Sequence, residues 1–186
     1  MRGRYCNLLE QIDLCKPKTI MEIGTWNGHH ALEMIERAER YNDNVLYTGF
    51  DLFEDFDASI IEHCPKKPAF LNSVKIYLRN KKAALIKGNT KATIKEFHKK
   101  QDFIFIDGGH SLATIKSDWE NIQRLMHKDT VVIFDDFYVG NYELGCNRLV
   151  TNLDRTIYSM EYLQPVEKFQ KNEWIQYTQM IKVTFR

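Results

Sequence analysis

Five short apolar runs, each rich in β-branched or aromatic residues, constrain the fold of this chain more than any other feature. They are Thr19–Ile23, Val45–Phe50, Ala83–Lys87, Phe103–Ile106 and Val131–Phe134. Near-continuous apolar runs of this length are typical of strands that are covered on both faces, as in a parallel sheet. We therefore predict five strands of one buried sheet.

Amphipathic segments separate several of these runs. His30–Arg40, Pro68–Asn80 and Leu112–Met126 each place apolar residues at helical spacing. Alternating strands and helices predict right-handed βαβ units in a doubly wound α/β fold. Asp51–Lys67 shows no clear period, and we expect a long loop or a short irregular helix there.

The C-terminal part of the chain does not continue this alternation of strands and helices. Tyr158–Phe169 and Trp174–Phe185 have the pattern of two long strands joined near Gln170–Glu173. An antiparallel hairpin added to a parallel sheet is a common arrangement. We predict a Rossmann-like, seven-stranded, mostly parallel sheet with a C-terminal antiparallel hairpin.

Charge and cysteine usage exclude several classes of protein. The chain has 26 Lys and Arg against 25 Asp and Glu, a formal net charge of +1, so it lacks the basic field of a nucleic-acid binder. No apolar run approaches the ~20 residues that span a bilayer, and the N-terminal segment has no apolar signal core. The four cysteines form no CxxC pair and have the pattern of reduced thiols. We expect a cytoplasmic protein with no nucleic-acid and no membrane partner.

A glycine-containing turn follows the first predicted strand, in the stretch IMEIGTWNGHH. Glycines at the carboxyl end of a parallel strand let the backbone pass close to a ligand, and the next helix offers free N–H groups. The motif is not GxGxxG, and Glu22 just before Gly24 would repel a phosphate. A ligand with an ammonium or sulfonium group fits the charge of Glu22 better. The alternative is an ordinary strand-to-helix turn.

Asp51 ends the second predicted strand and follows Gly28 by 23 positions. An acidic residue at about this distance accepts hydrogen bonds from ribose hydroxyls in Rossmann-like sites. The alternative is a loop or helix cap. Together, the turn and Asp51 favour a nucleoside ligand.

Acidic residues follow the fourth and fifth predicted strands. FIFIDGGH places Asp107 and His110 after one strand, and VVIFDDF places Asp135 and Asp136 at the end of the next. Three carboxylates at one sheet edge repel one another unless a cation joins them, and a hard divalent ion such as Mg²⁺ prefers oxygen ligands. His110 could then act as a general base. The alternatives are a metal-free acidic rim, a structural histidine, Asp107 as a helix cap and Asp135 in a turn.

These motifs resemble the class I S-adenosylmethionine-dependent methyltransferases. Within that superfamily the chain is similar to the small-molecule O-methyltransferases related to the macrocin and mycinamicin enzymes (methyltransferase family 24-like). The resemblance rests on the motifs EIGTWNG, GFDLFE, IKGNT, IDGGH and IFDDF, which lie between about Thr19 and Val150. The resemblance implies one methyltransferase domain over 1–186, with a helical extension over 1–18, a cofactor-binding core over 19–150 and the hairpin over 156–186.

The resemblance also implies roles for individual residues. S-adenosylmethionine (SAM) would be bound by Glu22, Gly24, Thr25, Trp26, Asn27, Gly28, Asp51, Leu52, Asn89, Thr90 and Asp107. His110 would be the catalytic base with Asp107 beside it. Asp107, Asp135 and Asp136 would hold Mg²⁺.

The expected activity is methyl transfer to a hydroxyl of a small, sugar- or phenol-like acceptor. Gly109 stands where related enzymes often carry an acidic residue, which excludes a base there, and the extra segments of the metal-binding relatives are not evident. Mg²⁺ dependence and a homo-oligomer are left open. The alternatives are a non-catalytic SAM-binding module or partner subunit and an NAD-dependent oxidoreductase.

Overall fold

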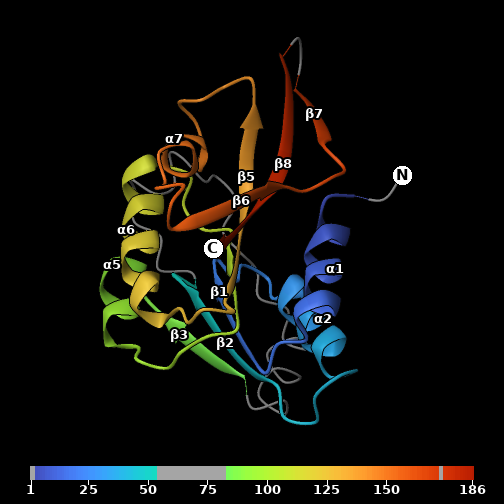
Figure 1. Ribbon diagram of the computed structural model, residues 1–186, viewed down its shortest axis with the longest axis vertical. Coiled ribbons are helices and arrows are strands. Elements are labelled where there is room, and N and C mark those ends of the chain that lie inside the picture. The colour runs from blue at the N-terminus through green and yellow to red at the C-terminus, as the bar shows by residue number, and fades with distance from the viewer. Residues whose placement is uncertain (1–2, 54–82, 172–173) are drawn as a thin grey trace.

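A twisted, mixed sheet forms the centre of the computed structural model, which describes residues 3–53, 83–171 and 174–186 (Figure 1). Its strands are β1 Thr19–Ile23, β2 Leu46–Asp51, β3 Ala84–Lys87, β4 Phe103–Ile106, β5 Val131–Val139, β6 Tyr158–Tyr162, β7 Glu167–Lys171 and β8 Trp174–Phe185. The strand order is β3-β2-β1-β4-β5-β8-β6, and β7 also pairs with β8. Strands β1 to β5 pair in parallel, whereas β8 runs antiparallel to its neighbours. The Rossmann-like α/β class is confirmed.

Helices cover both faces of this sheet, as Figure 1 shows, with α1 and α2 on one side and α5 and α6 on the other. The helical elements are α1 Tyr5–Cys15, α2 His29–Ala38, α5 Thr90–Thr93, η1 Ile94–Glu96, α6 Leu112–Ile122, η2 Gln123–Leu125 and α7 Asn147–Thr151. Two separate apolar clusters fill the two sides. Strand β4, whose four residues are all buried, contributes to both, which explains its unbroken apolar sequence.

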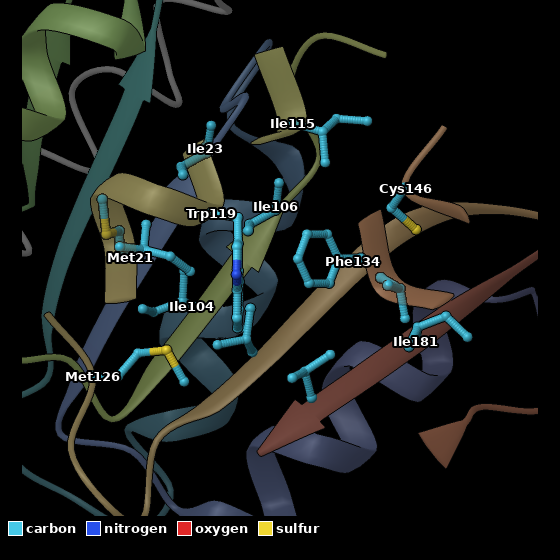
Figure 2. Close-up of a cluster of buried hydrophobic side chains, with 14 of the residues drawn as sticks. Met21, Ile23, Ile104, Ile106, Ile115, Trp119, Met126, Phe134, Cys146 and Ile181 are labelled. Atoms are coloured by element: carbon cyan, nitrogen blue, oxygen red, sulfur yellow. The ribbon is translucent and has the colours of Figure 1, made fainter. Parts of the chain in front are cut away.

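Trp119 of α6 fixes that helix to the sheet. Its ring lies 5.8 Å from the ring of Phe134, measured between centroids, and it is 3% exposed. Figure 2 shows the indole standing beside Ile104, Ile106 and Phe134. This packing positions the turn before α6, which carries Asp107 and His110.

Two expected boundaries change. The expected strand Tyr158–Phe169 is divided into β6 and β7, because Pro165 lies between them and has no N–H to donate to β8. Strand β5 continues to Val139, so Asp135 and Asp136 lie inside the strand and not at its end. The expected helix Pro68–Asn80 and most of the expected loop Asp51–Lys67 fall outside the described residues.

A register shift in β5 explains how two adjacent aspartates face the same site. Pairing of β5 with β8 is regular up to Phe134 and resumes at Phe137 with a shift. Such a bulge inserts one extra residue into the strand and re-aims the side chains around it. In a regular strand Asp135 and Asp136 would point to opposite faces.

Candidate functional site

The carboxyl ends of the parallel strands meet at one edge of the sheet. The N–H of Gly24 donates to the carbonyl of Phe50, and the N–H of Asp107 donates to the carbonyl of Ile23, both at 2.8 Å. The N–H of Gly88 donates to the carbonyl of Asp51 at 2.9 Å. Residues that follow β1, β2, β3 and β4 are therefore neighbours, as Brändén's rule for ligand sites in such sheets requires.

The loop after β1 has a backbone that demands glycine. Gly24 has a φ of 91° and Gly28 a φ of 75°. A Cβ on Gly24 would lie 2.1 Å from the backbone oxygen of Asp107, so the loop packs directly on the turn after β4. Trp26, at a φ of 44°, leaves its indole 53% exposed at this edge. The backbone of the turn is thus strained at Trp26, and solvent or a ligand can reach the side chain of this residue.

Asp51 connects this loop to the end of β2. Its Oδ2 accepts a 2.7 Å hydrogen bond from the N–H of Trp26, and its Oδ1 accepts one of 3.0 Å from the N–H of Phe53. Each carboxylate oxygen can accept a further bond. Asp51 and Leu52 are half-buried, so a ligand can still reach them. The ribose role of Asp51 and the cofactor-binding role of Leu52 stay predictions.

Glu22 lies beneath the loop and is only 1% exposed. Its carboxyl accepts a hydrogen bond from the hydroxyl of Tyr47, which in turn lies 3.4 Å from the Oγ1 of Thr25. Burial raises the pKa of Glu22 to about 8, although the bond from Tyr47 opposes this shift. Glu22 therefore supports the loop through Tyr47 and Thr25, and its direct role toward a methionine group stays a prediction.

The raised pKa of Glu22 has a testable effect on stability. Because the folded chain holds this proton more tightly than the unfolded chain, the free energy of unfolding should fall as pH rises from about 4.5 to about 8. One group can contribute a slope of up to about 1.4 kcal/mol per pH unit. Glu22→Gln should remove that part of the slope in urea titrations across this range, and the exposed Glu120→Gln should keep it. Equal slopes in wild type and Glu22→Gln would contradict the assignment.

Two asparagines expected at the cofactor serve as local caps. The Oδ1 of Asn27 accepts from the N–H of His29, and the Oδ1 of Asn89 accepts from the N–H of Lys91, both at 3.0 Å. Thr90 begins the short α5 and is half-buried. Gly88 places Asn89 and Thr90 next to Asp51, so the structure does bring these expected residues to one edge.

The acidic residues gather as expected. One oxygen from each of Asp107, Asp135 and Asp136 lies within 4.8 Å of the others. Burial raises the pKa of Asp107 well above its usual range, and the charges of Asp135 and Asp136 raise it further. Ser111, and not Asp107 or His110, caps α6 by accepting from the N–H of Thr114 at 3.2 Å. Helix capping therefore does not account for Asp107 or His110.

His110 pairs with one of these carboxylates. Its Nδ1 lies 2.5 Å from the Oδ2 of Asp136, and its side chain is 64% exposed. The hydrogen bond with Asp136 raises the pKa of His110, and the negative charges of Asp136 and Asp135 act in the same direction. Because Nδ1 is engaged, Nε2 is the ring nitrogen that can exchange a proton with a ligand.

Sequence reasoning missed Arg4 and Tyr5. The Nε of Arg4 donates to the Oδ1 of Asp135 at 2.7 Å, and its Nη2 donates to the Oδ2 at 2.6 Å. The hydroxyl of Tyr5 lies 3.2 Å from Asp135 and 3.4 Å from Asp107. Neither residue belongs to a motif, and 131 positions separate Arg4 from Asp135, so no spacing signal connects them.

A family model described as a methyltransferase domain matches residues 21–137, which is more than half of the chain. The chain belongs to this methyltransferase family. The match spans β2 to β4, most of β1 and β5, the glycine loop and the acidic cluster of this methyltransferase-family chain, and the resemblance to class I SAM-dependent methyltransferases is confirmed. A search of curated proteins finds no match.

Solved structures share the fold of this methyltransferase-family chain at low identity. An O-methyltransferase from Bacillus cereus in complex with SAH is 17% identical at a TM-score of 0.61, covering 97% of this chain and 79% of that one. The SAH-bound methyltransferase PaMTH1 from Podospora anserina is 18% identical at a TM-score of 0.60, and the match covers 100% of this chain and 80% of that one. The third structure is TomG from Streptomyces achromogenes, an O-methyltransferase involved in tomaymycin synthesis, in complex with SAM. It is 14% identical at a TM-score of 0.59, and the match covers 96% of this chain and 78% of that one. Within the described residues, no helix combines the length and apolar character needed to cross a membrane.

Proposed function

We propose that this chain is a SAM-dependent O-methyltransferase that acts on a hydroxyl group of a small molecule. One observation carries the proposal: the loop after β1 packs on the turn that presents the His110–Asp136 pair. The edge that we propose to bind the nucleoside is thus adjacent to a candidate base. The family and the O-methyltransferases among the structural neighbours support the same reaction class.

The residues at this edge fit the proposed cofactor. Gly24 and Gly28 let the backbone approach a ligand, and Asp51 offers acceptor positions to ribose hydroxyls. Trp26 exposes a ring face that can cover a bound molecule.

The roles of the chain's own residues follow from this arrangement. Bound SAM would supply the methyl group, whose bond to sulfur breaks with the electron pair left on sulfur. Nε2 of His110 would take the proton of the acceptor hydroxyl as its oxygen bonds to the methyl carbon. Asp136 would hold the imidazole through Nδ1 and stabilise the imidazolium that forms. Positioning of the two reactants would supply much of the remaining rate.

A divalent ion fits this site poorly. The three carboxylates have the oxygen chemistry that Mg²⁺ prefers. Both oxygens of Asp135, however, already accept hydrogen bonds from Arg4. We assign no step to a metal ion.

Cofactor binding tests the proposal and separates it from its alternatives. SAM or SAH at 100 times its dissociation constant should stabilise the chain by about 2.7 kcal/mol, which a thermal shift detects. A shift with NAD and none with SAM or SAH would favour an oxidoreductase. Binding of SAM without transfer to any of a panel of labelled hydroxylated acceptors would favour a non-catalytic binding module.

Asp51→Ala should weaken SAH binding by about 10- to 150-fold, because the loss of a hydrogen bond to a charged group costs about 1.5–3 kcal/mol. Isothermal titration calorimetry measures the change. Asp154→Ala is the matched control, because Asp154 also accepts from a backbone N–H, that of Thr156 at 2.8 Å, but precedes β6. An unchanged affinity in Asp51→Ala would remove the ribose role of Asp51.

A further inference from the structure

The guanidinium of Arg4 is built into the acidic cluster. Besides its two bonds to Asp135, it donates from Nη1 to the Oε2 of Glu167 at 2.8 Å. Its Nη2 lies 3.8 Å from the Oδ1 of Asp136. The backbone N–H of Arg4 donates to the other oxygen of Glu167, also at 2.8 Å. Arg4 therefore contacts three carboxylates from two strands, β5 and β7.

The surroundings of Arg4 hold it in this place. Only 7% of the residue is exposed. The guanidinium carbon lies 4.8 Å from the ring centre of Tyr5 and 5.1 Å from that of Phe169. Tyr5 in turn stacks on His30 with 3.8 Å between ring centres. A buried, bidentate and aromatic-packed arginine is a fixed part of a structure and not a mobile surface side chain.

Arg4 and a divalent ion would compete for the same carboxylate. Mg²⁺ binds oxygen atoms at about 2.0–2.1 Å and keeps a nearly octahedral shell that includes waters. The two oxygens of Asp135 face nitrogens of Arg4 at 2.6 and 2.7 Å. An ion held by Asp107, Asp135 and Asp136 would lie within a few ångströms of this fixed positive charge, and the two cations would repel each other.

We propose that Arg4 is the resident cation of the acidic cluster and stands in the position where a divalent ion would otherwise join Asp135 to Asp136. Arg4 is a positioning residue. It neutralises Asp135, so that Asp136 remains available to orient His110. The metal-binding part of this inference does not depend on the proposed function, whereas its effect on turnover does.

Binding of Mn²⁺ tests the inference without an activity assay. Mn²⁺ is titrated into the full chain without added cofactor, and free Mn²⁺ is followed by electron paramagnetic resonance. The wild type should leave Mn²⁺ free, and Arg4→Met should bind one ion. Arg37→Met is the matched control, because Arg37 also forms a two-nitrogen pair with an aspartate, Asp13, away from this site. That variant should bind no ion.

Three results would overturn the inference. One is stoichiometric Mn²⁺ binding by the wild type that Asp135→Asn abolishes. Another is a folded Arg4→Met chain that binds no Mn²⁺. The third is Mn²⁺ binding by Arg37→Met equal to that of Arg4→Met. If Arg4→Met does not fold, the wild-type titration and the Arg4→Lys variant decide, because a lysine that keeps the charge should still exclude Mn²⁺.

Turnover gives a second readout once an acceptor is known. Wild-type activity should survive EDTA, and Arg4→Lys should lower kcat by about 100-fold through misplacement of the base. The KM for SAM should change little, and the pH profile should shift because Asp136 no longer holds His110 in the same way. Loss of wild-type activity in EDTA would overturn the inference. Failure of SAH binding in calorimetry would instead count against the proposed function alone.

Discussion

His110→Ala is expected to lower turnover by about 10²- to 10⁴-fold, the usual contribution of a positioned general base. The Nδ1 of His110 is held by Asp136, so the ring has a defined orientation and one nitrogen left for the acceptor. The affinity for SAM should change less than twofold, because the ring lies on the turn after β4 and not on the loop after β1. Transfer of labelled methyl groups measures turnover, and calorimetry measures affinity.

A matched histidine separates this role from a general effect on the fold. His98 is exposed, lies near Arg124 and precedes β4, whereas Asp107 and His110 follow the opposite end of that strand. His98→Ala should retain full turnover. Asp136→Asn should lower turnover and keep SAM binding, because the imidazolium loses its stabilising partner. Full activity in His110→Ala would remove it as the base.

Gly24→Ala is expected to destabilise the chain by about 2–5 kcal/mol and to abolish measurable SAH binding. A side chain at a φ of 91° incurs the left-handed penalty of about 1–2 kcal/mol. The new Cβ would also lie 2.1 Å from the backbone oxygen of Asp107. Overpacking of this kind typically adds about 1–3 kcal/mol. The collision would displace the loop from the turn that presents His110.

Gly140→Ala provides the control for backbone strain. Gly140 has a φ of 81°, and within the described chain nothing lies within 4 Å of its added Cβ. It should therefore lose only about 1–2 kcal/mol and bind SAH normally. Urea titration and calorimetry on both variants make the comparison. Equal losses in the two variants would show that the contact with Asp107 has no effect.

The parts of the fold that depend on local sequence could be predicted. The parallel strands begin within one residue of their apolar runs, because both faces of the central strands are covered and their sequences are rich in apolar residues. The gathering of Asp107 with Asp135 and Asp136 followed from the rule that parallel strands end at one edge.

The arrangement within that cluster could not be predicted. Whether β5 ends at Phe134 or continues through a bulge depends on its pairing with β8, which lies more than 40 positions later. The burial of Glu22 depends on Tyr47 from the neighbouring strand. The pairing of Arg4 with Asp135 is a contact between distant parts of the chain. Each is a tertiary effect that leaves no periodic pattern in the sequence.

The contacts of Arg4 with Asp135 and Glu167 also have a consequence for the order in which parts of the chain fold. These pairs are separated by 131 and 163 positions, so they are among the least local contacts of the molecule. Closing loops of that length costs entropy before any contact offsets it, which makes such contacts late events in folding. During synthesis, moreover, residue 167 leaves the ribosome after the five parallel strands β1 to β5. The network around Arg4 is therefore expected to be completed only after the five parallel strands have been synthesised, when β7 brings Glu167 to it.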